Sequence, residues 1–270
     1  MAHGPAAYVH GYSQREGERL SDQAATLSEL LHHDTRFPEG ARVLEVGCGI
    51  GAQTAIVGPA NPGARIVSVE IALESLRQAR ERAAQQRLEN VRFVNADLFR
   101  LPFPDACFDH VFVCFVLEHV AEPLEALRHV RRVLKPDGRL TLIEGDHRSA
   151  YFHPWSELAW RTIDCLVTAQ ARAGGDALIG RRLFPLLRTA GFRDIAVTPR
   201  VVYADAGRPE WVEGFTRRTF IAMVQGARQR AIDLGLIDAA AWDAGIAALK
   251  RTAEVDGTFS YTFFKGTATR

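Results

Sequence analysis

The stretch Val43-Leu-Glu-Val-Gly-Cys-Gly-Ile-Gly51 determines the fold class that we expect for this chain of 270 residues. It starts in a short apolar run, which predicts a strand, and continues into three closely spaced glycines. A helix is expected directly after them, from residue 52 to residue 57. Glycine permits a tight turn and lets a ligand approach the backbone closely. A strand, a glycine-rich turn and a helix in this order are typical of a nucleotide-binding loop at the carboxyl end of a parallel strand.

Strand-like and helix-like segments alternate around this loop. Short apolar segments predict strands at residues 42–46, 65–69, 91–95, 110–116 and 139–143. Helical spacing and composition predict helices at residues 13–31, 52–57, 73–88 and 123–134. Gly58-Pro59 is expected to end the second of these helices. This order predicts an α/β fold with a doubly wound, mostly parallel sheet and helices on both faces.

The second half of the chain is less regular. Two further strands, at residues 195–203 and 258–264, would complete a seven-stranded sheet. Helices that read as lid insertions are expected at residues 156–172, 183–190, 209–234 and 239–253, and the long third one offers a surface for a homodimer. We expect one domain over residues 1–270, made of an N-terminal helical lid (1–40), a ligand-binding core (41–146), a helix-rich substrate-side region (147–257) and a final strand (258–270).

The glycine spacing separates two classes of nucleotide ligand. Gly47, Gly49 and Gly51 follow the pattern G-x-G-x-G, whereas dinucleotide sites follow G-x-G-x-x-G. Glu45 stands two positions before the first glycine, where a carboxylate would repel a pyrophosphate. The same carboxylate would attract the cationic amino group of S-adenosylmethionine (SAM). The loop therefore favours SAM over NAD.

Two more carboxylates stand at the ends of the following strands. Glu70 ends the second strand, where it can accept hydrogen bonds from ribose hydroxyls, and Asp97 ends the third, where it can meet an adenine amino group. Each of them alone can equally be a solvated strand end. Together with the glycine loop, residues 41–146 resemble the class I SAM-dependent methyltransferases, which have a Rossmann-like fold.

This resemblance implies a role for each matching position. Glu45, Gly47 and Gly49 would hold the methionine portion of SAM, and Gln53 would reach its carboxylate. Glu70 and its neighbour Ile71 would hold the ribose, Asp97 and Leu98 would flank the adenine, and Cys114 and Phe115 would line the floor near the sulfonium. Tyr8, in the N-terminal segment, would close over the bound donor.

The acceptor site is expected at Glu144-Gly-Asp-His147, which reads as a polar turn directly after the fifth strand. Because the carboxyl edge of a doubly wound sheet faces the ligand crevice, Glu144 or His147 can take a proton from the acceptor. Tyr12 is a third candidate for a catalytic role. The alternative is a solvated turn in which Asp146 caps the next segment. No third ligand at a recognisable spacing accompanies these residues, so we expect no metal.

Aromatic residues gather after this turn and in the late helix, and an aromatic pocket suits a planar or apolar small molecule; they are Tyr151, Phe152, Trp155, Trp160, Trp211, Phe215 and Phe220. The two ends of the chain, residues 8–16 and 261–266, are similar to bacterial methyltransferases that act on indole-containing or terpenoid natural products. This narrower resemblance implies methyl transfer to such a small-molecule intermediate.

Composition argues against several other classes of protein. Lys and Arg number 33 and Asp and Glu 32, for a net charge of +1, and a nucleic-acid partner usually requires a basic excess. No signal peptide or membrane span is recognisable, and four cysteines without CxxC spacing fit reduced thiols, so we expect a cytoplasmic protein without a membrane partner. A methyltransferase acting on a peptide or protein, a non-catalytic SAM-binding protein and an NAD-dependent oxidoreductase remain as alternatives.

Overall fold

The computed structural model describes residues 14–270, and all structural statements concern this part of the chain. Its seven strands form one sheet in the order β3-β2-β1-β4-β5-β7-β6. The pairs from β3 to β5 are parallel, and β7 is antiparallel to both β5 and β6. The predicted doubly wound, mostly parallel, seven-stranded sheet is confirmed. The strands are β1 (Arg42–Val46), β2 (Arg65–Glu70), β3 (Val91–Asn95), β4 (Phe108–Cys114), β5 (Leu134–His153), β6 (Arg193–Ala204) and β7 (Thr258–Thr269).

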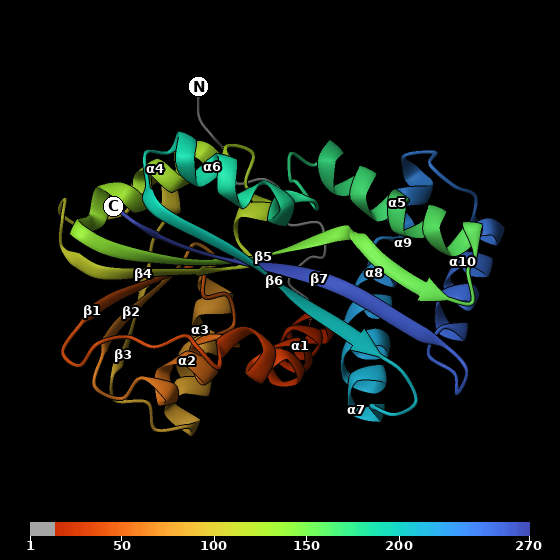
Figure 1. Cartoon of the computed structure of the whole chain (residues 1–270), viewed down its shortest axis with the longest axis horizontal. Helices are drawn as coiled ribbons and strands as arrows, with labels where there is room; N and C mark the ends of the chain where they lie inside the picture. The colour runs from red at the N-terminus through yellow and green to blue at the C-terminus, as the bar shows by residue number, and fades with distance from the viewer. Residues whose placement is uncertain (1–13) are drawn as a thin grey trace.

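Helices cover both faces of this sheet (Figure 1). One face carries α1, α2, α3, α7 and α8, and the other carries α4 and α6, while the buried residues of α5 belong to the core cluster that includes α1 and α8. None of the described helices is long and apolar enough to cross a bilayer. The α-helices are α1 (Gln14–His32), α2 (Thr54–Ala60), α3 (Leu73–Gln85), α4 (Pro123–Val133), α5 (Glu157–Arg172), α6 (Leu183–Thr189), α7 (Pro209–Trp211), α8 (Ala222–Gly226), α9 (Arg228–Asp233) and α10 (Ala239–Arg251). Short 3-10 helices are η1 (Leu98–Arg100), η2 (Leu117–His119) and η3 (Ile179–Arg182), and η4 (Val212–Ile221) is a π-helix.

The alternation of side chains along the central strands produces a core on each face of the sheet. Val43 of β1 packs in the cluster that includes Leu27 of α1, whereas the next residue, Leu44, packs with Leu127 of α4 on the opposite face. All four are 1% exposed or less. Burial of such a side chain contributes roughly 1.5–3 kcal/mol. The sheet is therefore held from both sides, as the apolar sequence of the central strands predicts.

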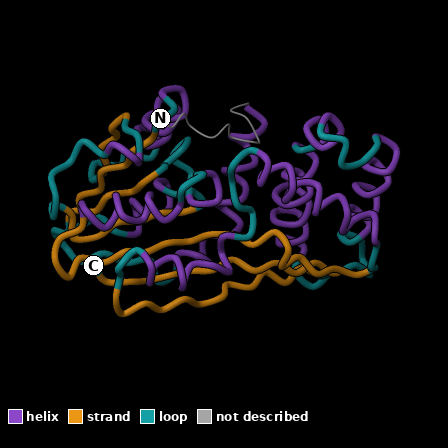
Figure 2. Tube along the Cα trace, turned by 90° about the horizontal axis from the view of Figure 1, so that it is seen from above, coloured by secondary structure: helices purple, strands orange, loops and turns teal. Residues whose placement is uncertain are grey.

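Strand β5 is much longer than the sequence suggested. The prediction that it ends at residue 143 and leads into a polar turn at residues 144–147 is wrong. β5 continues to His153 because β7 pairs with it from Arg139 onward, as in the pairs Asp146↔Thr262 and Tyr151↔Ser260, with an irregularity between them. Figure 2 shows these long strands running past the parallel part of the sheet toward the half of the molecule rich in helices.

The helix expected over residues 209–234 is also different. It is divided into α7, the π-helix η4, α8 and α9. In η4 the Thr219 hydroxyl donates to the Gly214 carbonyl, five residues earlier, at 2.8 Å. Gly214 lies so close to α1 that a β-carbon there would be 2.3 Å from Thr26 Oγ1. Since π-helical turns are frequent at functional sites, this segment is of interest for the cavity described below.

Helix α2 does not end at residue 58 as expected, but continues through Pro59 to Ala60. Proline lies in the last turn, where its missing N–H removes a single backbone bond. Beyond this turn, the side chain of Asn61 donates from Nδ2 to the Val57 carbonyl at 2.8 Å.

Candidate active site

A cavity of about 680 Å³ lies at the carboxyl ends of the parallel strands, which is ample for a small-molecule ligand. One end is walled by the glycine loop after β1 and by the residues that follow β2 and β3. The other end is walled by η4, β7 and the middle of β5. The cavity therefore joins the expected donor site to a region built from the second half of the chain.

The glycine loop needs its glycines for two different reasons. Gly47 and Gly49 both have left-handed backbone angles, with φ of +68° and +53°. A β-carbon at Gly47 would lie 2.6 Å from Val116 Cγ2, so close packing excludes any side chain at this position. At Gly49 nothing among the described residues lies within 4 Å of such a carbon. The backbone at Gly49 therefore faces open cavity, which is the close approach that a ligand requires.

The two strand-end carboxylates lie on the cavity wall beside this loop. Glu70 accepts a hydrogen bond from the backbone N–H of Gly49 at 3.0 Å and another from Ala72 at 2.9 Å. Its carboxylate is thus fixed, and each oxygen retains a lone pair for a further donor. Asp97 accepts from the N–H of Phe99 at 2.9 Å and caps η1. Ile71, which is 45% exposed, and Leu98 complete this part of the wall.

Glu45 is not among the residues that line the cavity. It is 4% exposed, and its Oε2 accepts hydrogen bonds from Ser68 at 2.6 Å and from Thr54 at 2.7 Å. Burial raises the pKa of this carboxyl, and the two hydroxyls oppose that rise. Glu45 thus ties β1, β2 and the start of α2 together beneath the loop that was expected to use it for direct binding.

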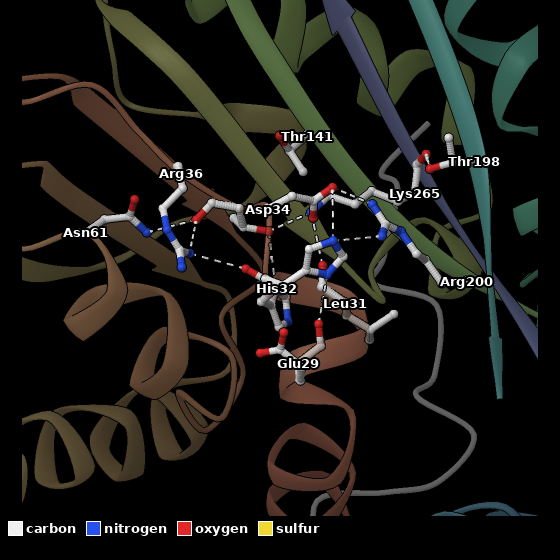
Figure 3. A network of polar contacts seen from close by, with 12 residues as sticks. Glu29, Leu31, His32, Asp34, Arg36, Asn61, Thr141, Thr198, Arg200 and Lys265 are labelled. Atoms are coloured by element: carbon white, nitrogen blue, oxygen red, sulfur yellow. Dashed lines mark hydrogen bonds and ion pairs between the residues drawn. The ribbon is translucent and has the colours of Figure 1, made fainter. Parts of the chain in front are cut away.

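Gln53 lines the cavity and is anchored from outside it. Its Oε1 lies 2.8 Å from Nε2 of His32, at the end of α1. Burial lowers the pKa of His32 to about 4, so this imidazole is neutral near pH 7. Lys265 of β7 fixes the same end of α1 by donating to Asp34 at 2.6 Å and to the Leu31 carbonyl at 3.0 Å (Figure 3). A buried polar network therefore joins α1, the donor loop and the last strand.

The floor of the cavity is formed where β4 ends. Cys114 and Phe115 both line it. Burial raises the pKa of the Cys114 thiol well above its usual value, so the sulfur stays uncharged. Phe115 has a left-handed φ of +57°, a strained conformation for a bulky residue, and its ring centroid lies 5.4 Å from that of Phe263. Phe115 thus stands between the two ends of the cavity.

The structure separates the two members of the expected catalytic pair. Glu144 is fully buried and does not line the cavity, so it cannot meet an acceptor directly in this arrangement. Its Oε1 accepts from the backbone N–H groups of Val116 at 3.0 Å and Leu117 at 2.7 Å. His147 does line the cavity, and its Nδ1 lies 2.8 Å from the hydroxyl of Tyr261. Tyr8 and Tyr12 lie outside the described residues.

The aromatic end of the cavity agrees only in part with the sequence expectation. Phe215 and Phe220 of η4 line it together with Tyr261 and Phe263 of β7. The ring centroids of neighbouring members lie 4.7 to 6.4 Å apart. The remaining expected aromatics lie elsewhere and do not line the cavity; they are Tyr151, Phe152, Trp155, Trp160 and Trp211.

Residues 44–142 match a family described as a methyltransferase domain. They span the strands β1 to β4, the glycine loop and both strand-end carboxylates. This part of the chain is a methyltransferase domain. The acceptor end of the cavity, from His147 onward, lies outside the matched residues.

Relatives of this chain extend the comparison. An uncharacterized 37.1 kDa protein in transposon TN4556 of Streptomyces fradiae is 33% identical over 221 residues, which are 79% of this chain and 63% of that protein. The 27-O-demethylrifamycin SV methyltransferase of Amycolatopsis mediterranei is 32% identical over 49% of each chain. This chain thus spans about half to two thirds of the length of these relatives. The crystal structure of the 4+2 cyclase SpnF has the same fold, with a TM-score of 0.56 and 23% identity over 92% of this chain and 80% of that one.

Glu118 is among the cavity residues of the methyltransferase domain that were missed in the sequence. Glu118, in η2 directly after β4, lines the acceptor end, and its Oε2 lies 3.9 Å from Nε2 of His147. The rule that located Glu70 and Asp97, a carboxylate just beyond a parallel strand, applies equally to Glu118. The apolar residues around it in the stretch Phe115-Val-Leu-Glu-His119 drew attention to packing instead.

Proposed function

We propose that this protein transfers the methyl group of SAM to a small-molecule acceptor. The observation that carries the proposal is the cavity that joins the glycine loop and its two carboxylates to an aromatic region at His147. The donor end fits SAM in chemistry: open space at Gly49, a fixed carboxylate at Glu70 for ribose hydroxyls, and an uncharged Cys114 on the floor.

When bound, SAM supplies a methyl group activated by a positively charged sulfur. The residues of this chain would bind and align the two partners. Gly47, Gly49 and Gln53 would hold the methionine portion, Glu70 and Ile71 the ribose, and Asp97 and Leu98 the adenine. Phe115 would separate the donor from the acceptor except at the reacting atoms. Since methyl transfer proceeds in line, alignment by such walls contributes much of the catalysis.

For the acceptor we propose an aromatic, indole-like or terpenoid natural-product intermediate. Phe215, Phe220, Tyr261 and Phe263 support this class because they offer apolar and aromatic surface to a ligand. The relative named as a rifamycin methyltransferase acts, by its name, on a natural product, which agrees with this choice.

Two measurements test the proposal. Calorimetry should show one molecule of SAM or S-adenosylhomocysteine bound per chain and no binding of NAD. Methyl-labelled SAM, offered with a panel of aromatic and terpenoid alcohols and amines, should label a small-molecule product. Tight NAD binding without SAM binding would refute the donor site, and SAM binding without transfer to any small molecule would favour a protein acceptor or a non-catalytic role.

A further inference from the structure

At the acceptor end of the cavity, the buried atom Nε2 of His147 lacks a hydrogen-bond partner among the described residues. The side chain is 5% exposed, and burial lowers its pKa, so the imidazole is neutral near pH 7. A neutral imidazole carries its hydrogen on one nitrogen and a lone pair on the other. Which of the two nitrogens carries the hydrogen depends on the hydrogen bond made by Nδ1.

Tyr261 is the hydrogen-bond partner of Nδ1 of His147, with its hydroxyl oxygen 2.8 Å away. Burial raises the pKa of the Tyr261 phenol well above the usual value, so the hydroxyl keeps its hydrogen. When this hydroxyl donates to Nδ1, the hydrogen of the neutral imidazole stands on Nε2.

The carboxylate of Glu118 provides a hydrogen-bond acceptor beside Nε2 of His147. Its Oε2 lies 3.9 Å from Nε2 of His147, too far for a direct hydrogen bond. Gln170 positions it by donating from Nε2 to the Glu118 carbonyl at 3.0 Å, and this amide also lies 3.5 Å from Oε2. An oxygen atom placed about 2.8 Å from both groups can accept from His147 and donate to Glu118.

Resting on the function proposed above, we propose that His147 and Glu118 together bind a hydroxyl group of the acceptor, so that the reaction is O-methylation with Glu118 as the general base. A hydroxyl oxygen has two lone pairs, so one can accept from His147 while the other attacks the methyl carbon. An amine nitrogen has a single lone pair, which it needs for the attack on the methyl carbon. An indole nitrogen or ring carbon has no free lone pair with which to accept from His147. The pair therefore selects an alcohol or phenol.

The step balances with these groups alone. The acceptor oxygen forms a bond to the methyl carbon as the bond from sulfur to that carbon breaks, and the bonding pair passes to sulfur. The hydroxyl hydrogen passes as a proton to the Glu118 carboxylate. The products are a methyl ether, S-adenosylhomocysteine and a protonated Glu118, which returns its proton to water.

Glu144 acquires a positioning role in this arrangement. By accepting from the N–H groups of Val116 and Leu117, it fixes the start of the short helix η2 that carries Glu118. The backbone N–H of Asp176 holds the same helix from the other side, through the Glu118 carbonyl at 2.9 Å. Burial and the charge of Glu118 raise the pKa of Glu144, which is consistent with a buried support and not with a solvent-exposed base.

The tautomer of His147 is tested in the absence of any methyl-acceptor substrate. In protein labelled with ¹⁵N in histidine, the imidazole signals of His147, assigned with the variant His147→Gln, should show a protonated Nε2 and an unprotonated Nδ1. Tyr261→Phe should remove this preference. A protonated Nδ1 in the wild-type protein would overturn the proposal.

The hydroxyl site is tested with two matched probes, 2-naphthol and naphthalene, added to protein saturated with S-adenosylhomocysteine. We expect 2-naphthol to bind at least about tenfold tighter, because a hydrogen bond to a charged group contributes about 1.5–3 kcal/mol. Glu118→Leu should abolish this preference, whereas Glu89→Leu, at an exposed loop position, should leave it unchanged.

Equal affinity of the wild-type protein for both probes, binding of neither, or a preference that survives Glu118→Leu would overturn the hydroxyl site. S-adenosylhomocysteine affinity is measured in each variant, so failure at this end of the cavity is distinguished from failure of the donor site. In Glu118→Leu that affinity should stay within a few-fold of wild type, which also shows that the variant folds.

Discussion

The glycine loop allows binding and folding to be perturbed separately. Gly49 and Gly40 share a left-handed backbone, with φ of +53° and +74°, and at neither would a β-carbon meet another described atom within 4 Å. They differ in place: Gly49 lines the cavity, whereas Gly40 lies in the turn before β1 and does not. Alanine at either position should therefore cost the same backbone strain, and only Gly49→Ala should obstruct a ligand.

The left-handed conformation costs an alanine about 1–2 kcal/mol. Urea unfolding should accordingly show similar losses of stability, of this size or somewhat less, for both variants. Calorimetry with S-adenosylhomocysteine should show at least about a tenfold loss of affinity, equivalent to about 1.4 kcal/mol, for Gly49→Ala. Gly40→Ala should bind as wild type does.

Two results would refute this reasoning. Wild-type affinity in Gly49→Ala would mean that the ligand does not approach the loop there. An equal loss of affinity in Gly40→Ala would mean that the strain, and not the methyl group in the cavity, weakens binding. Gly47 is a poorer probe, because a β-carbon 2.6 Å from Val116 Cγ2 would disturb packing as well as the ligand.

Three further perturbations test the supporting structure. Glu144→Ala leaves the backbone N–H groups of Val116 and Leu117 without their acceptor and should lower the free energy of unfolding by about 2–6 kcal/mol in urea titrations. Glu144→Gln keeps an acceptor oxygen and should lose less stability. Wild-type stability in the alanine variant would contradict the supporting role of Glu144. The folded pKa of His32 is about 4, whereas an unfolded histidine protonates near pH 6.5, so unfolding takes up a proton between these values. The free energy of unfolding should therefore fall as pH falls through this window. In urea titrations His32→Gln should flatten that slope, and His33→Gln, at a half-exposed position, should not. Gly214→Ala forces a methyl group to within 2.3 Å of Thr26 Oγ1 and should lower the free energy of unfolding by about 1–3 kcal/mol in urea titrations. Adding Thr26→Ala should restore part of this loss. Fully additive effects in the double variant would show that residues 26 and 214 do not contact each other.

The donor end of the cavity could be predicted from the sequence because its signals are local. A glycine needed for a left-handed turn and a carboxylate at the end of a strand are both read within a few residues, as Gly49 and Glu70 show. The position of Glu45 could also have been derived, since side chains alternate along a strand. Glu45 shares the face of Val43, which packs toward α1 and α2, and its contact with Thr54 at the start of α2 lies on that face.

The acceptor end could not be predicted in the same way because its contacts are long-range. His147 meets Tyr261, 114 residues later, only because β5 continues past the parallel sheet to pair with β7. Nothing within residues 144–147 indicates that pairing, so a polar turn was the natural interpretation. The π-helix η4 depends in turn on the close approach of Gly214 to α1, which no local pattern of the late helix contains.

This division of the cavity has a consequence for specificity. The donor contacts come from the loop after β1 and from the ends of β2 and β3, whereas the aromatic acceptor wall comes from η4 and β7, outside the residues that match the methyltransferase family. Substitutions in η4, at Phe215 or Phe220, can therefore change the shape of the acceptor space without touching a donor residue. Glu118 connects the two parts, because it follows β4 in the matched region yet faces His147 of β5. Acceptor shape can thus vary through η4, while the atom that receives the methyl group stays fixed at the hydroxyl site between Glu118 and His147.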